Sequence, residues 1–290
     1  MKKTIIILGV LGTAFSAIIV RFADAPSTVL VFYRMLFSVL LLCPAALVFH
    51  RKEFSDINAR QVGLCMVSGV FLGMHFFCYF QSLKYTGIAS AVVLVDTEVF
   101  FTALGGLLFL REKVGVRSWI GIILTFAGSV IVALGDAGRG GIAGDVLALS
   151  GALCSAVYTL IGRTCRKSMS TTIYTWIVYF CAGAAILPAA LITGDQVVPC
   201  STASLAAALG LAVLCTLLGH SIFSWGLKYE KASFVSVVKL LEPVFASVMG
   251  IILFLEIPPL SSSAGGIVII GGIVLCILGG HEEVALQVKS

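Results

Sequence analysis

Several ionisable side chains lie deep inside long apolar stretches of this sequence. A charged group at the centre of a membrane-spanning helix costs at least about 2.5 to 3.5 kcal/mol, so each one calls for a function or a partner. Carboxylates with a lysine can bind a zwitterion or relay a proton, and histidines titrate near neutral pH. We therefore predict a substrate or proton pathway built from Glu242, Lys239, Glu98, His75, His220, Arg34, Asp96 and Tyr79.

The two glutamates fall near the middle of their apolar runs. Lys239 lies three residues before Glu242, so both share a helix face, and an ion pair within the helix is feasible. Pro243 frees a backbone carbonyl beside them, which a cavity could use. The acidic positions are predicted to bind a zwitterion or to relay a proton.

Asp96 and Glu98 lie two residues apart, about 200° around a continuous helix. They are therefore not expected to face one cavity together. Depth in the membrane makes Arg34 the natural partner of Asp96, either as a packing ion pair between two helices or as part of a substrate contact. His75 and His220 fit proton coupling or, equally, a bond to a buried carbonyl.

The elements that must position these residues are membrane-spanning helices. Of 290 residues, 59% are hydrophobic and 11% are charged, with a mean hydropathy of +1.10, whereas soluble domains carry roughly 25% charged residues. A span needs about 20 apolar residues. Ten runs qualify, at approximately 4–21, 27–49, 61–83, 87–110, 115–135, 142–163, 172–193, 204–227, 231–255 and 262–280. The soluble-looking segments are 50–60 and the tail from His281.

Basic residues predict the orientation of these runs. With the N-terminus in the cytoplasm, 14 of the 19 Lys and Arg residues fall in cytoplasmic segments and only Arg21, Lys84 and Arg139 fall outside. Cytoplasmic loops are enriched in Lys and Arg, so both termini are expected in the cytoplasm. The start of the chain imitates a signal peptide but is interpreted as an uncleaved first helix.

The sequence repeats itself. A shift of 144 residues places Glu98 on Glu242 and Glu112 on Glu256 without a gap, and the same shift superposes Leu83-Lys84-Tyr85 on 227–229 and Gly121 and Gly128 on Gly265 and Gly272. Five spans are an odd number, so the second copy must run through the membrane in the opposite direction. We predict an all-α membrane protein of ten transmembrane helices in two inverted five-helix repeats, 1–140 and 141–290, as in many secondary transporters.

Other residues have plainer interpretations. Glu112 and Glu256 are each expected to cap the helix that follows them. The Gly69–Gly73 pair is interpreted as a close helix contact. The nine cysteines include no CxxC pair, which argues against a zinc site or a disulfide framework, and the basic residues are too scattered for nucleic acid. We expect no cofactor, no metal and no catalytic residue.

These residues resemble the drug/metabolite transporter superfamily, in particular its ten-helix EamA-type members. The similarity lies in Tyr33-Arg34, Lys84-Tyr85, Lys228-Tyr229 and Glu242-Pro243, together with the paired Glu112 and Glu256; Val99 departs from it, because a proline is usual after the first mid-helix glutamate. The resemblance implies a central cavity lined by helices one to four and six to nine, with the fifth and tenth helices peripheral. Members of the family mostly export amino acids, nucleosides or other small metabolites.

The expected function is a secondary transporter, most simply an exporter, of small metabolites such as amino acids across the bacterial inner membrane. No P-loop is present, so the cycle would be facilitated or proton-coupled. The expected partners are the lipid bilayer and a small-molecule substrate, and the expected state is a monomer or a weak homodimer. A flippase for a lipid or lipid-linked sugar and a non-transporting sensor are the alternatives. A membrane enzyme would need a compact motif such as HExxH, which is absent.

Overall fold

The structure is a computed structural model that describes residues 2–20, 23–85, 88–112, 114–135, 142–198, 200–242, 244–245 and 260–289. Every regular element in these ranges is helical, and six of the helices are long and apolar enough to cross a membrane. Val116–Gly128 and Ser263–Gly279 are shorter apolar helical stretches. Pro243 and Glu256 lie outside the described residues.

The first half of the chain follows the predicted runs closely. Its helices are α1 (Lys2–Ala14), α2 (Ser16–Val20), α3 (Ser27–Pro44) with the π-helical turn η1 (Ala45–Phe49), α4 (Arg51–Asp56), α5 (Ala59–Tyr85), α6 (Ile88–Asp96), α7 (Glu98–Phe109) and α8 (Val116–Gly135). The π-helical turn begins directly after Pro44, which has no N–H to continue the α-helical ladder. The 50–60 segment, expected as a loop, contains the short helix α4.

The second half contains α9 (Ile142–Cys165), α10 (Thr171–Ile192), α11 (Thr202–Gly210), the π-helix η2 (Leu211–His220), α12 (Ser221–Gly226), α13 (Ala232–Lys239) and α15 (Leu260–Lys289). Ser170 and Ser201 cap α10 and α11 by accepting hydrogen bonds from the N–H groups of Ile173 and Ser204. The C-terminal helix continues through the tail that was expected from His281.

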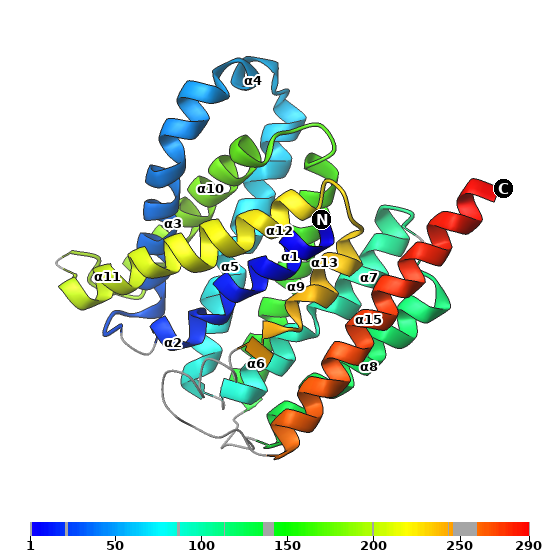
Figure 1. Ribbon diagram of the computed structural model, residues 1–290. Helices are drawn as coiled ribbons and strands as arrows, with labels where there is room; N and C mark the ends of the chain where they lie inside the picture. The colour runs from blue at the N-terminus through cyan, green and yellow to red at the C-terminus, as the bar shows by residue number, and fades with distance from the viewer. Residues whose placement is uncertain are drawn as a thin grey trace.

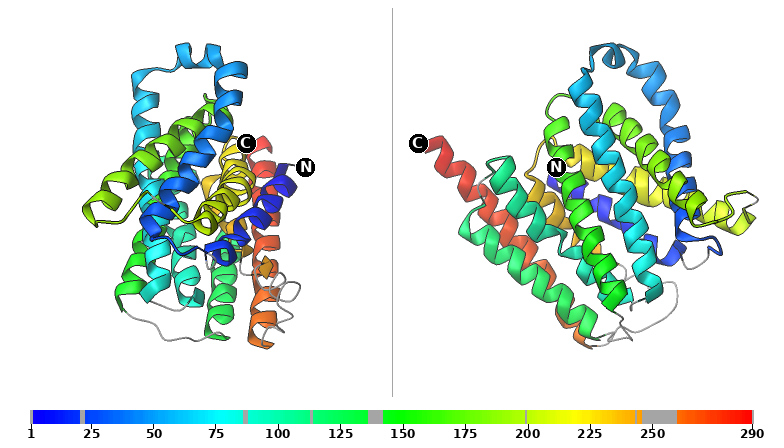
Figure 2. Two further views of the ribbon diagram at one scale, coloured as in Figure 1. Left: turned by 90° about the vertical axis from the view of Figure 1, so that its left-hand side faces the viewer. Right: turned by 180° about the vertical axis from the view of Figure 1, so that it is seen from behind.

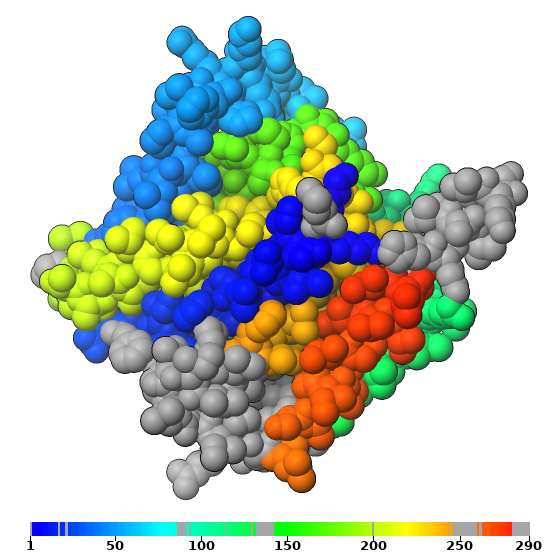
Figure 3. Space-filling model, in the orientation of Figure 1, coloured from blue at the N-terminus to red at the C-terminus, as the bar shows by residue number. Residues whose placement is uncertain are grey.

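The helices pack around two apolar cores. One core gathers buried residues of α3, α5, α9, α10 and η2, and the other gathers residues of α1, α7, α12, α13 and α15. In Figures 1 and 2, α5 lies alongside α9, and α8 and α15 form a pair at one side of the bundle. Figure 3 shows α1 on one face, between the η2–α12 segment and α13.

Helices α8 and α15 cross at glycines that correspond in the two repeats. A Cβ on Gly121 would lie 2.7 Å from the carbonyl oxygen of Gly272, and one on Gly128 would lie 2.8 Å from that of Gly265. The chain directions are therefore antiparallel, and the two backbones approach each other closely at these glycines. In the same way Gly69 lies against the backbone of Val178 in α10, which confirms the close helix contact predicted for that glycine pair.

Candidate functional site

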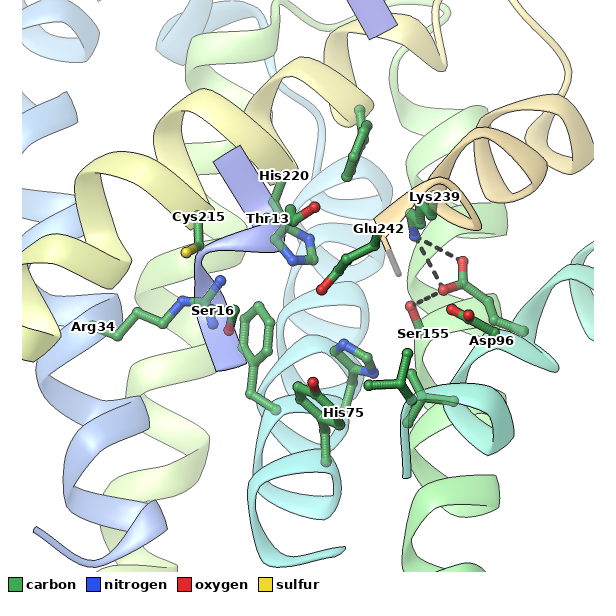
Figure 4. A pocket seen from close by; sticks show the side chains of 16 residues that line it. Thr13, Ser16, Arg34, His75, Asp96, Ser155, Cys215, His220, Lys239 and Glu242 are labelled. Carbon is green, nitrogen blue, oxygen red and sulfur yellow. Dashed lines mark hydrogen bonds and ion pairs between the residues drawn. The ribbon is translucent and has the colours of Figure 1, made fainter. Parts of the chain in front are cut away.

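A cavity in the middle of the bundle brings together all eight residues predicted for the pathway (Figure 4). The other lining residues are Thr13, Ser16, Phe76, Val92, Val95, Ser155, Cys215 and Phe223. The whole lining comes from α1, α2, α3, α5, α6, α7, α9, η2, α12, α13 and, just after α13, Glu242; neither α8 nor α15 contributes a lining residue. The expected lining included the seventh helix, α10, but no described residue of α10 lines the cavity.

An interruption of the fourth long helical run places Asp96 and Glu98 on the same cavity. α6 ends at Asp96 and α7 begins at Glu98; between them, the N–H and the hydroxyl of Thr97 both donate to the carbonyl of Leu94. This i to i−3 bond tightens the turn, so the 200° separation expected of a continuous helix does not apply. The prediction that only one of these acids could face the cavity is wrong.

The second repeat has an interruption at the matching position. α13 ends at Lys239, and the N–H groups of Leu240 and Leu241 bond three residues back, to Val237 and Val238. Because a shift of 144 residues places Thr97 on Leu241, the two repeats break the same helix at equivalent points. Discontinuous helices at membrane depth are found where the backbone lines a cavity.

Glu98 is held by four donors. Lys239 Nζ lies 2.8 and 3.1 Å from the two carboxylate oxygens. Three hydroxyls also donate to them, at 2.6 Å from Ser155, 3.0 Å from Thr159 and 3.0 Å from Ser236. Such saturation compensates the loss of hydration that a buried carboxylate suffers.

The pairing of Lys239 differs from the one expected. It joins α13 to α7 through Glu98, the carboxylate of the other repeat, and not to Glu242 three residues further along its own chain. Ser236 lies three residues before Lys239 and extends the helix face that Lys239 and Glu242 share, but Ser155 and Thr159 were not singled out from the sequence. The spacing of Ser155 and Thr159, four residues apart on one face of α9, is the signal that could have pointed to them.

Arg34 is almost completely buried and does not pair with Asp96. Its Nε donates to the Thr216 hydroxyl at 2.8 Å, and its guanidinium lies 3.9 Å from the centre of the Phe76 ring. Thr216 sits in η2, where its hydroxyl bonds to the carbonyl of Leu211, five residues back. Within the described ranges, no carboxylate lies within ion-pair distance of Arg34. The predicted Arg34–Asp96 pair is therefore absent from this conformation.

The aromatic and histidine side chains form one layer of the cavity wall. His75 Nδ1 lies 3.0 Å from the carbonyl oxygen of Gly151, the carbonyl bond that was one of its two expected roles. The rings of Tyr79 and His75 are stacked with centres 6.4 Å apart, and His220 lies 6.4 Å from His75 and 5.0 Å from Phe76. Tyr79 and His220 thus share a surface with the Lys239–Glu98 ion pair and with Asp96 and Glu242.

A second polar cluster, away from the cavity, also joins the two halves. Glu112 Oε1 accepts from Arg163 Nε at 2.6 Å and its Oε2 accepts from the Ala232 N–H at 3.1 Å, while Arg163 also donates to the Leu227 carbonyl. Glu112 therefore caps α13, in the other half, instead of the helix that follows it. Arg163 was not identified from the sequence.

Comparisons with known proteins bear on this fold. The model of the EamA-like transporter family matches residues 3–134 and 142–278. An uncharacterized transporter of Archaeoglobus fulgidus is 28% identical over 87% of this chain and 88% of its own length. The pseudopaline exporter CntI of Pseudomonas aeruginosa is 26% identical over 88% of this chain and 86% of its own.

A solved crystal structure has the same fold as this chain. It superposes with a TM-score of 0.78 over 96% of this chain and 97% of that chain, at 16% sequence identity. Two copies of a family model placed in tandem account for nearly all residues, and the members of that family are transporters, not enzymes. The chain therefore belongs to the EamA-like transporter family, within the drug/metabolite transporter superfamily.

Proposed function

We propose that this protein exports small metabolites such as amino acids across the bacterial inner membrane by alternating access around the central cavity. The observation that carries the proposal is that the seven ionisable residues chosen as costly in a membrane, together with Tyr79, all line one cavity between the two halves of the chain. Residues that only stabilised packing would have no reason to gather there. Membership of a transporter family supports the same reading.

The proposed topology has ten transmembrane helices in two inverted repeats, 1–140 and 141–290, with both termini in the cytoplasm. The excess of Lys and Arg in alternate loops supports it. So does the antiparallel contact of α8 with α15, because corresponding helices of inverted repeats must run in opposite directions. Reporter fusions at His50, Gly194 and the C-terminus would test it: the first and last should report cytoplasm and the second should report the outside.

Glu98 and Glu242, which correspond in the two repeats, are in unlike surroundings. Glu98 is saturated by donors of the second repeat, whereas Glu242 forms no ion pair with any residue that the structure describes. We infer that Glu242 is the acid available to substrate or proton, and that Glu98 and Lys239 hold the halves together in this conformation. Exchange of these roles in the opposite-facing conformation would be one way for the inverted repeats to alternate.

The test is export from reconstituted vesicles. Purified protein is placed in vesicles loaded with a defined mixture of amino acids and nucleosides, and the compounds released are identified by mass spectrometry. Glu242→Gln should abolish release while the protein stays folded, and Asp56→Asn, at an exposed position in α4, is the control. Release that is equal in empty vesicles, in the wild type and in Glu242→Gln would reject the proposal.

The pseudopaline exporter among the relatives supports an outward direction. Inside-out membrane vesicles would test this, because an exporter accumulates its substrate in them. A flippase on the same fold predicts instead that labelled lipid equilibrates between leaflets only when the protein is present. A sensor predicts neither result.

A further inference from the structure

Three buried polar atoms of the cavity have no hydrogen-bond partner: Asp96 Oδ2, Tyr79 OH and His220 Nδ1. In the part of the chain that the structure describes, only one other buried side-chain atom shares this property, Trp176 Nε1, and Trp176 does not line the cavity. A buried polar atom without a partner costs about 1 to 3 kcal/mol. Because three of these unpartnered atoms line one cavity, they point to a ligand whose atoms supply the missing hydrogen bonds.

The charges of the cavity are divided between two sides. Lys239 and Glu98 balance each other in their ion pair. Among the residues that the structure describes, Arg34 then remains as a cation with no carboxylate at ion-pair distance, and Asp96 and Glu242 remain as acids with no cation at that distance. In Figure 4 Arg34 enters from one wall, Asp96 lies near the opposite wall beside the ion pair, and Glu242 projects between them.

We propose that the ligand of this cavity is amphoteric, with a carboxylate that binds the guanidinium of Arg34 and a protonated amine that binds Asp96 and Glu242. This inference rests on the proposed function, because it names the substrate class of the same cavity. The bond from Nε to Thr216 and the Phe76 ring fix the guanidinium plane, which leaves its terminal nitrogens for the two oxygens of a carboxylate. Tyr79 and His220 offer further bonds to polar groups between the ends.

The charge balance also rejects simpler ligands. A dicarboxylate would bring its second carboxylate against Asp96 and Glu242, and like charges at short distance in a membrane repel strongly. A simple amine would leave Arg34 buried without a counter-charge, which is costly. With Arg34 as the one unpaired cation and Asp96 and Glu242 as unpaired acids among the described residues, the cavity favours a ligand of net charge zero or plus one.

Matched compounds test this directly. The thermal stability of the purified protein is measured with phenylalanine, 3-phenylpropionate and 2-phenylethylamine, and with lysine, 1,5-diaminopentane and hexanoate, each at one concentration. A ligand that binds the folded state raises its stability by an amount that grows with the logarithm of its affinity. We expect an amphoteric compound from at least one series to bind at least about tenfold more tightly than its analogues lacking the amine or the carboxylate. Equal binding of an analogue, or no shift with phenylalanine or lysine, overturns the inference.

Variants separate the two ends of the ligand. Arg34→Gln should make the amphoteric compound bind no better than the matching amine, and Asp96→Asn should make it bind no better than the matching carboxylate. Arg60→Gln and Asp56→Asn, both at exposed positions, are the controls and should keep full selectivity. If Arg34→Gln does not fold, Arg34→Lys keeps the charge and should keep a weakened preference. Folded cavity variants with unchanged selectivity contradict the inference.

The vesicle experiment distinguishes this inference from the proposed function. Export of compounds that carry only one kind of charge, or none, would leave the exporter proposal standing and remove the amphoteric ligand. Export of nothing would remove the proposed function itself.

Discussion

Lys239 of α13 and Glu98 of α7 form an ion pair across the interface of the two repeats, with Nζ 2.8 Å from Oε1 (Figure 4). The two side chains are largely buried, at 13% and 7% exposure. Their contact links the two interrupted helices, one from each half of the chain, at the cavity wall.

Removing one partner of this pair should destabilise the protein. Lys239→Met leaves the Glu98 carboxylate buried with hydroxyl donors alone, and we expect a loss of up to about 3 kcal/mol in the free energy of unfolding. The double variant Lys239→Met/Glu98→Leu should recover most of it, because no buried charge remains. Unfolding in detergent measures both, and additive losses would show that the two residues do not interact.

The two corresponding glutamates should respond differently to the same substitution. Glu98→Gln disturbs five hydrogen bonds from four donors and should lower the thermal midpoint, whereas Glu242→Gln removes a carboxylate that has no ion-pair partner among the described residues and should leave the midpoint nearly unchanged. Thermal unfolding of the two variants side by side is the measurement. A larger loss for Glu242→Gln would contradict the assignment.

Glu112→Gln should loosen the start of α13. The carboxylate accepts from the Ala232 N–H and from Arg163, so its neutralisation weakens two charge-assisted bonds. Hydrogen exchange should become faster at the Ala232 amide. Glu53→Gln is the matched control: Glu53 accepts from the Ser170 N–H, so this change should affect the start of α10 alone.

The α8–α15 contact predicts opposite effects for two adjacent glycines. A Cβ on Gly272 would lie 2.6 Å from Thr125 N and 2.7 Å from Gly121 O, whereas one on Gly271 would have nothing within 4 Å. Gly272→Ala should lower the thermal midpoint. Gly271→Ala should preserve or raise it, because alanine is favoured over glycine in helices by about 1 kcal/mol. Equal effects would mean that the helices do not meet at this face.

The contribution of Asp195 to the stability of the folded protein should depend on pH. Hydrogen bonds from the Thr28 and Thr193 hydroxyls lower the pKa of this partly exposed carboxyl below its usual value. The ionised form is therefore favoured by folding, and its contribution is present above the unfolded pKa near 3.9 and lost as pH falls through the folded one. Asp195→Asn should reduce stability at pH 7 but not at pH 2. A pH-independent difference would assign the effect to something other than ionisation.

The residues of the cavity could be found from the sequence because charge is conspicuous in an apolar run. Which of these residues pair with one another could not be predicted from the sequence. The expected partners of Asp96 and Lys239 were derived for straight helices, and the turns at Thr97 and at Leu240 redirect each side chain. No local signal announces either turn, since leucine and threonine are ordinary in membrane helices.

Hydroxyl groups were equally hard to select. Ser155 and Thr159 differ in no local way from the many serines and threonines that bond to their own helix, as Ser38 and Thr175 do. They bond to a carboxylate only because α7 packs against α9 and brings Glu98 within hydrogen-bonding distance. The fold was easier to predict, because span length and the 144-residue repeat depend on composition and register and not on side-chain direction.

The glycine contact between α8 and α15 has an evolutionary consequence. It is made by the same positions of each repeat, so that Gly121 meets Gly272 and Gly128 meets Gly265. Two separate copies of one five-helix unit could form this seam as readily as two halves of one chain, since a two-fold interface uses identical surfaces on both sides. Fusion of duplicated genes would then preserve an existing contact, and substitutions on one side would favour compensating substitutions on the other.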